Sequence, residues 1–167
     1  QVNALVSTQL KALTTAQLNA LDTADVAAMG TSQIQALSSS QVASLSTDRV
    51  TALTSGQIQA LTSTQIAGLT TGQVASLTTS QIEALTTAQV QALGSSQIAS
   101  MSSSQIAAIQ TADLASLTTG QITGLTTSVI QSLTTSQVAG LSTAQFSALT
   151  NTQLNALSTT QVQAIET

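Results

Sequence analysis

The fold is decided by a stretch of eight residues, Gln-Ile-Gln-Ala-Leu-Thr-Ser-Thr at positions 57–64, and by its repetition along the chain. The unit recurs without insertion or deletion from residue 1 to residue 167, as twenty complete copies and a twenty-first that lacks its last position. Uninterrupted repetition at a short period is typical of solenoids and filaments rather than of globular enzymes. We label the eight positions a to h, with Gln57 at position a.

Each position of this octad accepts few residue types. Position b is always apolar, position e is always Leu, Met or Ile, and position d is always Ala, Ser or Gly. Position a is Gln in 17 of the 21 copies, the exceptions being Asp25, Arg49, Asp113 and Val129. Position c carries most of the variation, as a solvent-facing position would. The pattern therefore predicts that b, d and e face an interior.

The spacing of b and e argues against a continuous strand and against one unbroken helix. Steps of three and five residues are both odd, so they would place b and e on opposite faces of a strand. The Ala, Gln and Gly content also fits strands poorly. At about 100° per residue, an unbroken helix overshoots two turns by about 80° in every octad, and its apolar stripe would spiral around the axis. A short helix with a break in every octad satisfies the pattern.

Position f supplies the break, because it is Ser, Thr, Asp or Gly in 18 of the 21 copies, and these residues are the preferred N-caps of helices. Asp22 is a clear case, since Asp replaces Thr well at a cap. Three residues later the position-a Gln completes a capping box, and the Leu before the cap pairs with the next b residue in a hydrophobic staple. Leu61, Thr62, Gln65 and Ile66 form one full set. We predict an all-α solenoid of very short capped helices, one per eight residues, with a β-solenoid as the alternative.

We expect residues 1–167 to form a single uninterrupted array and to be a segment of a longer chain, because both ends fall inside a repeat. Low complexity often indicates disorder, but here the apolar positions are too regular and too numerous. No apolar run exceeds four residues, and a membrane span needs about 20, so we expect no membrane insertion. The small residues at d, including Gly68, Gly124 and Gly140, predict that successive helices approach closely.

Charge is scarce in this sequence, with a net charge of −4. Two cations cannot neutralise a row of phosphates, so we expect no nucleic-acid partner. The same scarcity argues against docking on anionic lipid. The basic residues are Lys11 and Arg49, and the acidic residues are Asp22, Asp25, Asp48, Glu83, Asp113 and Glu166.

The sequence predicts no catalytic, cofactor-binding or metal-ligating residue. It contains no His and no Cys, which removes common bases, nucleophiles and transition-metal ligands. Asp22 and Asp25 could form a carboxylate pair, but we interpret Asp22 as a cap and Asp25 as a substitute for Gln near a helix start, where negative charge is favoured. We interpret Asp48 and Arg49 as a solvated pair. The scattered acids do not converge as calcium ligands do, so we expect a protein without cofactors that is not an enzyme.

Two resemblances to known families follow from the octad. The run Leu-Thr-Thr-Ala-Gln-Val-Gln-Ala-Leu at 85–93 resembles the opening helix of the DNA-reading repeats of transcription-activator-like effectors. The likeness covers one helix start, without a second long helix, a base-reading loop or a basic stripe, so DNA binding is not carried over. The whole chain resembles the L-T/S-T/S-x-Q-I/V-x-A-L octapeptide arrays of large, low-charge bacterial surface or secreted proteins. This resemblance implies an extracellular or cell-surface structural or adhesive role, in which the four exceptions at position a weaken single caps and leave the array intact.

We expect a structural repeat protein that forms or extends an extracellular filament, sheath, stalk or adhesin. The expected partner is the chain itself, as a homo-oligomer or polymer, because a thin solenoid gains from length or side-by-side association and a nearly uncharged surface presents little repulsion. The alternative is a binding module whose repetitive surface recognises ice, a polysaccharide or another cell surface, since Ser and Thr at f and g would form a regular hydroxyl row. Phe146 is the only aromatic residue, which disfavours sugar stacking, and the sequence identifies no particular ligand.

Overall fold

The computed structural model describes residues 2–166, apart from the side chains of Asn3 and Glu166. Gln1 and Thr167, and with them the capping role expected of Gln1, lie outside the described residues. Twenty short α-helices and two 3₁₀ turns follow one another between residues 2 and 166, and no strand occurs among them. The predicted all-α solenoid with one helix per octad is therefore confirmed, and the β-solenoid alternative is wrong.

The helices contain four to six residues each and begin once per octad. Their bounds are η1 (Val2–Ala4), α1 (Ser7–Ala12), α2 (Thr15–Leu18), α3 (Thr23–Ala28), α4 (Thr31–Ala36), α5 (Ser39–Ser44), α6 (Thr47–Thr51), α7 (Ser55–Ala60), α8 (Ser63–Ala67), α9 (Thr71–Ser76), α10 (Thr79–Glu83), α11 (Thr87–Ala92), α12 (Ser95–Ala99), α13 (Ser103–Ala108), α14 (Thr111–Ala115), α15 (Thr119–Thr123), α16 (Thr127–Ser132), α17 (Thr135–Ala139), α18 (Thr143–Ala148), α19 (Asn151–Asn155), α20 (Thr159–Gln163) and η2 (Ala164–Glu166).

Most helices begin at the cap that the sequence predicts. The exceptions are α1 and α14, which follow Val6 and Gln110 and have no side-chain cap bond. Before α8, Thr62 is extended, with φ −72° and ψ 156°, and its hydroxyl oxygen accepts the Gln65 N–H at 3.2 Å. The Gln65 side-chain oxygen accepts the Thr62 N–H at 2.7 Å, which completes the capping box. At Gly30 and Gly94 the cap has no side chain, and only the glutamine half of the box forms. The predicted capping box at the start of the short helix is therefore confirmed.

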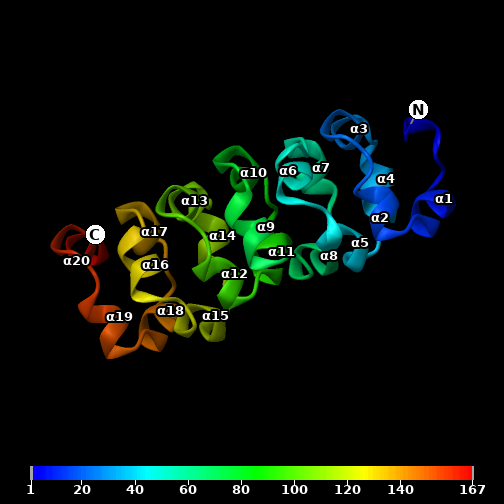
Figure 1. The fold of residues 1–167 in the computed structure, drawn as a ribbon. Helices are drawn as coiled ribbons and strands as arrows, with labels where there is room; N and C mark the ends of the chain where they lie inside the picture. The colour runs from blue at the N-terminus through cyan, green and yellow to red at the C-terminus, as the bar shows by residue number, and fades with distance from the viewer. Residues whose placement is uncertain (1, 167) are drawn as a thin grey trace.

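Three helices make one turn of the solenoid. Helix α8 packs against α5 and α11, and α10 packs against α7 and α13. Each helix therefore contacts the third helix before it and the third helix after it in the sequence. One turn therefore spans three octads, or 24 residues. Figure 1 shows the resulting elongated molecule, with the termini at opposite ends. Stacking is what sustains the helices, because an isolated helix of six residues is unstable in water.

The side chains at b and e fill the axis of the solenoid as one continuous core. In the middle of the chain they are almost completely buried, with Ile58 and Ile66 at 0% exposure and Leu61 at 4%. Burial of each such side chain contributes about 2 kcal/mol to folding. The predicted burial of b and e is confirmed, and the predicted solvent exposure of position c is confirmed at Gln35 and Glu83.

Position d lies at the contact between turns and is half-buried in most copies. Its predicted place in the core is confirmed only in part, since Ala36 is buried, whereas Ala84 and Ala92 are half-buried and pack against the core.

Position d sits at the end of each helix and faces the start of the helix one turn earlier. A Cβ on Gly124 would stand 2.7 Å from the Cβ of Ser95, and one on Gly68 would stand 3.1 Å from the Cβ of Ser39. The predicted close approach is confirmed between successive turns rather than between neighbouring helices.

Candidate functional surfaces

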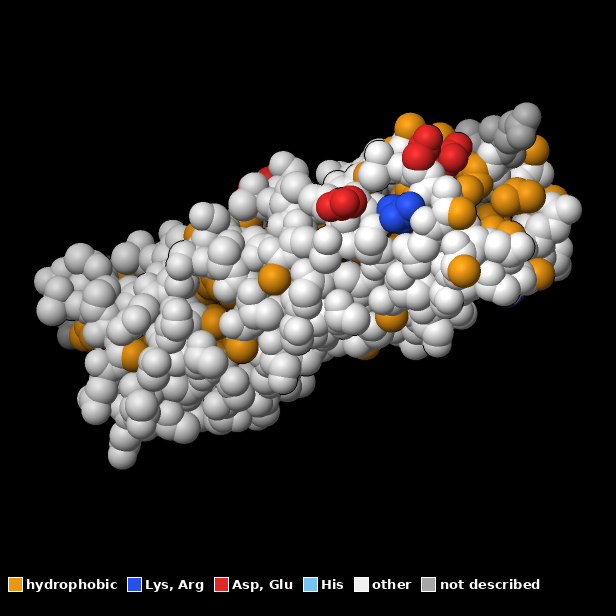
Figure 2. Space-filling model, in the orientation of Figure 1, with side chains coloured by type: hydrophobic (Ala, Val, Ile, Leu, Met, Phe, Trp, Pro, Cys, Tyr) orange, Lys and Arg blue, Asp and Glu red, His pale blue; other side chains and the backbone are white. Residues whose placement is uncertain are grey.

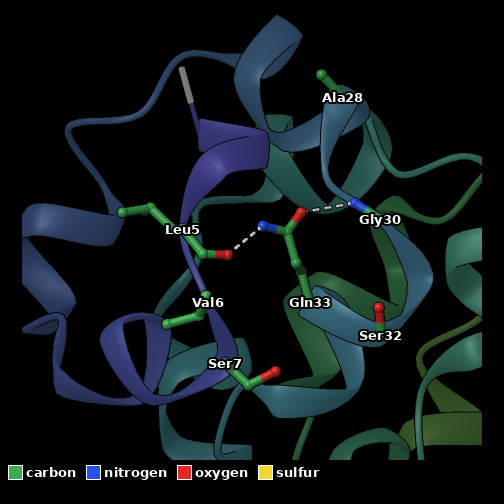
Figure 3. A pocket seen from close by; sticks show the side chains of 7 residues that line it. All are labelled: Leu5, Val6, Ser7, Ala28, Gly30, Ser32 and Gln33. Carbon is green, nitrogen blue, oxygen red and sulfur yellow. Dashed lines mark hydrogen bonds between the residues drawn. The ribbon is translucent and has the colours of Figure 1, made fainter.

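The position-a glutamine joins one turn of the solenoid to the turn before it. Figure 3 shows the first instance, in which Gln33 of α4 reaches toward the chain at Leu5. Its side-chain oxygen accepts the Gly30 N–H at 2.8 Å, as the capping box requires. Its Nε2 donates to the carbonyl oxygens of Leu5 at 2.7 Å and of Val2 at 3.1 Å. One amide therefore caps its own helix and binds the preceding turn.

The same geometry recurs along the solenoid. Gln65 donates to the carbonyls of Ile34 at 2.9 Å and Leu37 at 2.7 Å, which lie 31 and 28 residues earlier. Its side chain is 2% exposed, so each polar atom of the amide is removed from water and satisfied by the protein. We call this set the glutamine ladder. Its members with acceptors at both distances are Gln33, Gln41, Gln57, Gln65, Gln73, Gln81, Gln89, Gln97, Gln105, Gln137, Gln145, Gln153 and Gln161.

Sequence analysis assigned these glutamines to capping alone and missed the bonds between turns. A signal for them is present in the sequence. Glu completes a capping box as well as Gln does, yet Glu never stands at position a in this chain. Only the amide offers donors in addition to an acceptor. A strict preference for Gln over Glu at such a position therefore indicates a second partner for the side chain.

Arg49 replaces a ladder glutamine and reproduces its donor bonds to the preceding turn. The Nε atom donates to the Leu21 carbonyl at 2.8 Å, and Nη2 donates to the Asn19 carbonyl. The Nη1 atom donates to the hydroxyl of the cap residue Ser46 at 2.8 Å. The interpretation of Arg49 as half of a solvated pair with Asp48 is wrong, because its guanidinium is occupied by the preceding turn and its own cap.

Asp113 replaces another ladder glutamine, and a neighbouring residue compensates for the lost amide. The carboxylate is 6% exposed and accepts the Thr87 hydroxyl at 2.6 Å. Gln110 stands at position f, where Ser or Thr is usual, and its Nε2 donates to the Glu83 carbonyl of the preceding turn at 3.1 Å. Helix α14 and its N-cap therefore retain one amide bond between turns, although the amide has moved from position a to position f of the octad before it.

Val129 is the exception that leaves its place in the ladder empty. Its N–H is accepted by the Thr126 hydroxyl at 3.3 Å, so the helix keeps half of its capping box. Across residues 2–166, no side chain donates to the carbonyls of Ile98 and Met101, which lie 31 and 28 residues earlier. The effect of this exception extends beyond a single cap, to the contact between two turns.

The acidic residues of α3 behave as sequence analysis predicts, since the Asp22 carboxylate caps the helix by accepting the Asp25 N–H at 2.7 Å. The described residues contain no group of three or more His, Cys, Asp or Glu side chains placed to hold a metal ion. They also contain no helix with the length and apolar character needed to cross a bilayer. Glu166 was counted among the scattered acids, and its side chain lies outside the described residues.

Among the side chains that the structure describes, the exposed charged groups lie between residues 11 and 83. Lys11, Asp22, Asp48 and Glu83 are exposed, whereas Asp113, the one charged residue between 84 and 165, is buried. Figure 2 shows that the charged side chains on the visible face gather over the N-terminal half of the molecule. The remaining surface is a nearly uncharged expanse of Ser, Thr, Ala and Gln.

Three hollows of the surface lie near the two ends of the described residues. The hollow drawn in Figure 3 lies between the segment Leu5–Ser7 and the start of α4. A second one, lined by Val2, Leu5, Leu21 and Asp25, opens onto the N-terminal end of the core. A third opens at the other end and includes Leu141, Phe146 and Ile165.

Comparison with known proteins links this geometry to a repeat family. A family described as the ALTTAQ repeat matches residues 18–55, 50–79, 79–108 and 106–143, which together cover more than half of the chain. No curated protein matches the sequence. The six residues Ala-Leu-Thr-Thr-Ala-Gln occur at 84–89 and contain the staple leucine, the cap threonine and the ladder glutamine of one octad.

Proposed function

The chain belongs to the ALTTAQ repeat family, and we propose that it is a non-enzymatic structural protein that forms or extends a filament, sheath, stalk or adhesin by self-association. The observation that carries this proposal is the glutamine ladder. Each turn binds the carbonyls of the turn before it and offers equivalent carbonyls to the turn after it. A solenoid of this kind gains length and stability by adding copies of itself.

The surface supports the same proposal. The stretch from residue 84 to residue 165 carries no exposed charge, and low net charge favours association between proteins because it removes mutual repulsion. The resemblance to octapeptide arrays of bacterial surface and secreted proteins supports an extracellular or cell-surface location for this role. We expect such an array to act as a spacer or as a component of a sheath.

The test is the state of the purified chain at rising concentration. We expect the weight-average mass in sedimentation velocity to increase with concentration, and cryo-electron microscopy of concentrated samples to show ordered fibres or tubes. A monodisperse monomer throughout, seen as separate thin rods, contradicts self-association.

The regular rows of hydroxyls support a second candidate, a module that binds a repetitive surface. On the face formed by α9, α12, α15 and α18, residues Thr71, Ser95, Thr119 and Thr143 occupy the same position on successive turns. Such a row has the regularity of a crystalline ligand such as ice, or of a polysaccharide. Thermal hysteresis of a freezing solution and binding on a carbohydrate array test this function, and a negative result in both contradicts it.

A further inference from the structure

We infer that the solenoid contains a hinge, at the contact of α14, α15 and α16 with the turn before them. These three helices form one complete turn, and the glutamine ladder is incomplete in all three. The inference goes beyond the proposed function, because a hinge of this kind acts within a single copy of the chain.

The ladder positions of this turn hold Asp113, Gln121 and Val129. The Asp113 carboxylate accepts hydrogen bonds and Val129 has no polar side-chain group, so neither takes the place of an amide donor. Gln121 donates to the carbonyls of Gln91 at 2.9 Å and Leu93 at 2.7 Å, which lie 30 and 28 residues earlier, and so misses the acceptor 31 residues earlier. Nowhere else between residues 33 and 161 do three consecutive positions a depart from the ladder.

Most of the carbonyls that this turn should bind have no side-chain donor. They belong to Ile82, Leu85, Val90, Leu93, Ile98 and Met101. Within residues 2–166, only the Leu93 carbonyl receives a side-chain donor. The turn formed by α8, α9 and α10 provides the comparison, because Gln65, Gln73 and Gln81 bind all of the equivalent carbonyls there.

Most of the hydrogen bonds that remain at the hinge lie at the surface. Gln91 donates to the Ser116 carbonyl at 3.0 Å, and the Ser132 hydroxyl donates to that of Ser103 at 3.1 Å, both in exposed positions. Gln121 is half-buried, whereas the ladder glutamines of α8, α9 and α10 are 2–3% exposed. Because water competes for exposed hydrogen bonds, these hold the two turns together less firmly than a buried ladder does.

Two of the three helices also lack a complete capping box, which is an independent weakness. Helix α14 follows Gln110 and has no side-chain cap bond. Before α16, the Thr126 hydroxyl accepts the Val129 N–H, but Val129 has no side-chain oxygen to return the bond. Loss of a cap costs about 1 kcal/mol, so α14 and α16 are less stable than helices with a full box.

The apolar core nevertheless continues through the hinge. Ile98 is 0% exposed, and Leu114 and Ile130 are each 1% exposed. Apolar contacts have no preferred direction, whereas hydrogen bonds fix the relative orientation of the groups they join. The two parts of the solenoid can therefore tilt against each other without exposing the core, which makes this contact a hinge rather than a break.

Two pairs of spin labels test the hinge. Gln59→Cys with Gln131→Cys places one label on each side of it, in α7 and α16. The control pair, Gln35→Cys with Ala107→Cys, lies in α4 and α13 and does not cross it. In both pairs the labels occupy exposed c positions that are 72 residues, or three turns, apart (131 − 59 and 107 − 35). The chain has no cysteine of its own, so the labels attach only at these positions.

We expect double electron–electron resonance on the purified chain to give a wider distribution of distances for the pair across the hinge than for the control pair. Equal widths overturn the inference. This comparison uses chains with complete ladders and caps in their native state, so it does not depend on the folding of any ladder variant.

Repair of the ladder should remove the hinge. Asp113→Gln with Val129→Gln supplies both missing amides, and we expect it to narrow the distribution across the hinge to the width of the control pair. The reverse variant, Gln65→Asp with Gln81→Val, removes the corresponding amides from α8 and α10 and should widen the distribution of the control pair. A wide distribution that persists after repair has another cause and overturns the inference.

Hydrogen exchange of the backbone amides, followed by mass spectrometry, locates the opening in the unlabelled chain. We expect the amides of α14, α15 and α16 to exchange roughly tenfold or more faster than those of α8, α9 and α10, because each missing hydrogen bond lowers the free energy of local opening by about 1 kcal/mol. The repaired variant should exchange at similar rates in both turns. Exchange in α14, α15 and α16 that is no faster than in α8, α9 and α10 overturns the inference.

Discussion

At the scale of the residue, the fold depends on the two ends of one amide. The oxygen of Gln73 caps its own helix at 2.9 Å, and its nitrogen donates to Val42 at 2.9 Å and Leu45 at 2.8 Å. Arg49 can replace a ladder glutamine because the guanidinium also carries several donors, whereas Val129 cannot. Donor capacity toward the preceding turn, rather than polarity alone, is therefore what position a requires.

The substitution Gln65→Glu isolates the donor. It keeps the acceptor for the Thr62 N–H but leaves a buried carboxylate facing the carbonyls of Ile34 and Leu37. We expect the free energy of unfolding to fall by about 3 kcal/mol, because a buried charge without a partner is costly. Urea denaturation followed by far-UV circular dichroism measures the change.

The matched control for that substitution is Gln59→Glu, in which the same chemical change occurs at an exposed c position. It should alter the free energy of unfolding by no more than about 0.5 kcal/mol. Equal effects at Gln65 and Gln59 would mean that the bonds between turns contribute nothing to stability.

Val129→Gln should repair the interrupted ladder. The new amide can accept the Thr126 N–H and donate to the carbonyls of Ile98 and Met101, to which no side chain between residues 2 and 166 donates. Glutamine is accommodated at this position in other turns with about the same burial. We expect a gain of about 1 kcal/mol in the free energy of unfolding, measured by urea denaturation. Val129→Glu restores the cap acceptor alone, so a gain as large from Glu would assign the effect to capping.

At the scale of the element, the helices are held by what lies one turn away. Helix α15 ends at Thr123, and its C-cap is Gly124. A Cβ on Gly124 would stand 2.7 Å from the Cβ of Ser95 at the start of α12, which is too close for two atoms that are not bonded. In most other octads position d carries Ala or Ser. The Gly124 contact is therefore a local close approach that the larger residues at other d positions do not require.

Gly124→Ala should destabilise the chain by about 1 kcal/mol, because its Cβ would meet Ser95 and force two turns apart. Gly56→Ala is the matched substitution, since a Cβ on Gly56 meets nothing within 4 Å. It should stabilise the chain by about 0.5–1 kcal/mol through helix propensity. The melting temperature should fall in Gly124→Ala and rise in Gly56→Ala. An equal rise in both variants would show that the two turns separate without cost.

At the scale of the whole molecule, sequence analysis predicted the structure that depends on residues close together in the sequence. It missed the hydrogen bonds between successive turns and the number of helices in a turn. The caps join residues three apart, so a single octad contains their full signal. The number of helices per turn depends on contacts between residues 28 to 31 apart. Because the octads are nearly identical, the sequence does not indicate which octad a given octad contacts. A weak trace of the 24-residue turn lies at position c, where Lys11, Gln35, Gln59 and Glu83 all fall on one face.

A chain built on this rule should tolerate the loss of a whole octad. When residues 57–64 are deleted, Gln65 meets the carbonyls of Val26 and Met29, which bind Gln57 in the intact chain. Every later glutamine likewise finds carbonyls at b and e, so we expect the helical circular dichroism per residue and a cooperative thermal transition to be retained.

Deletion of residues 57–60 removes only half an octad and serves as the control. It shifts all later glutamines by four positions, so that Gln65 faces Gly30 and Gln33, where no equivalent acceptor pair exists. Because the mismatch persists for a full turn around the deletion, three consecutive helices lose their bonds to the preceding turn. We expect a lower melting temperature and loss of helical signal relative to the octad deletion. Equal behaviour of the two deletions would mean that the core alone holds the turns together and that the glutamine ladder is incidental.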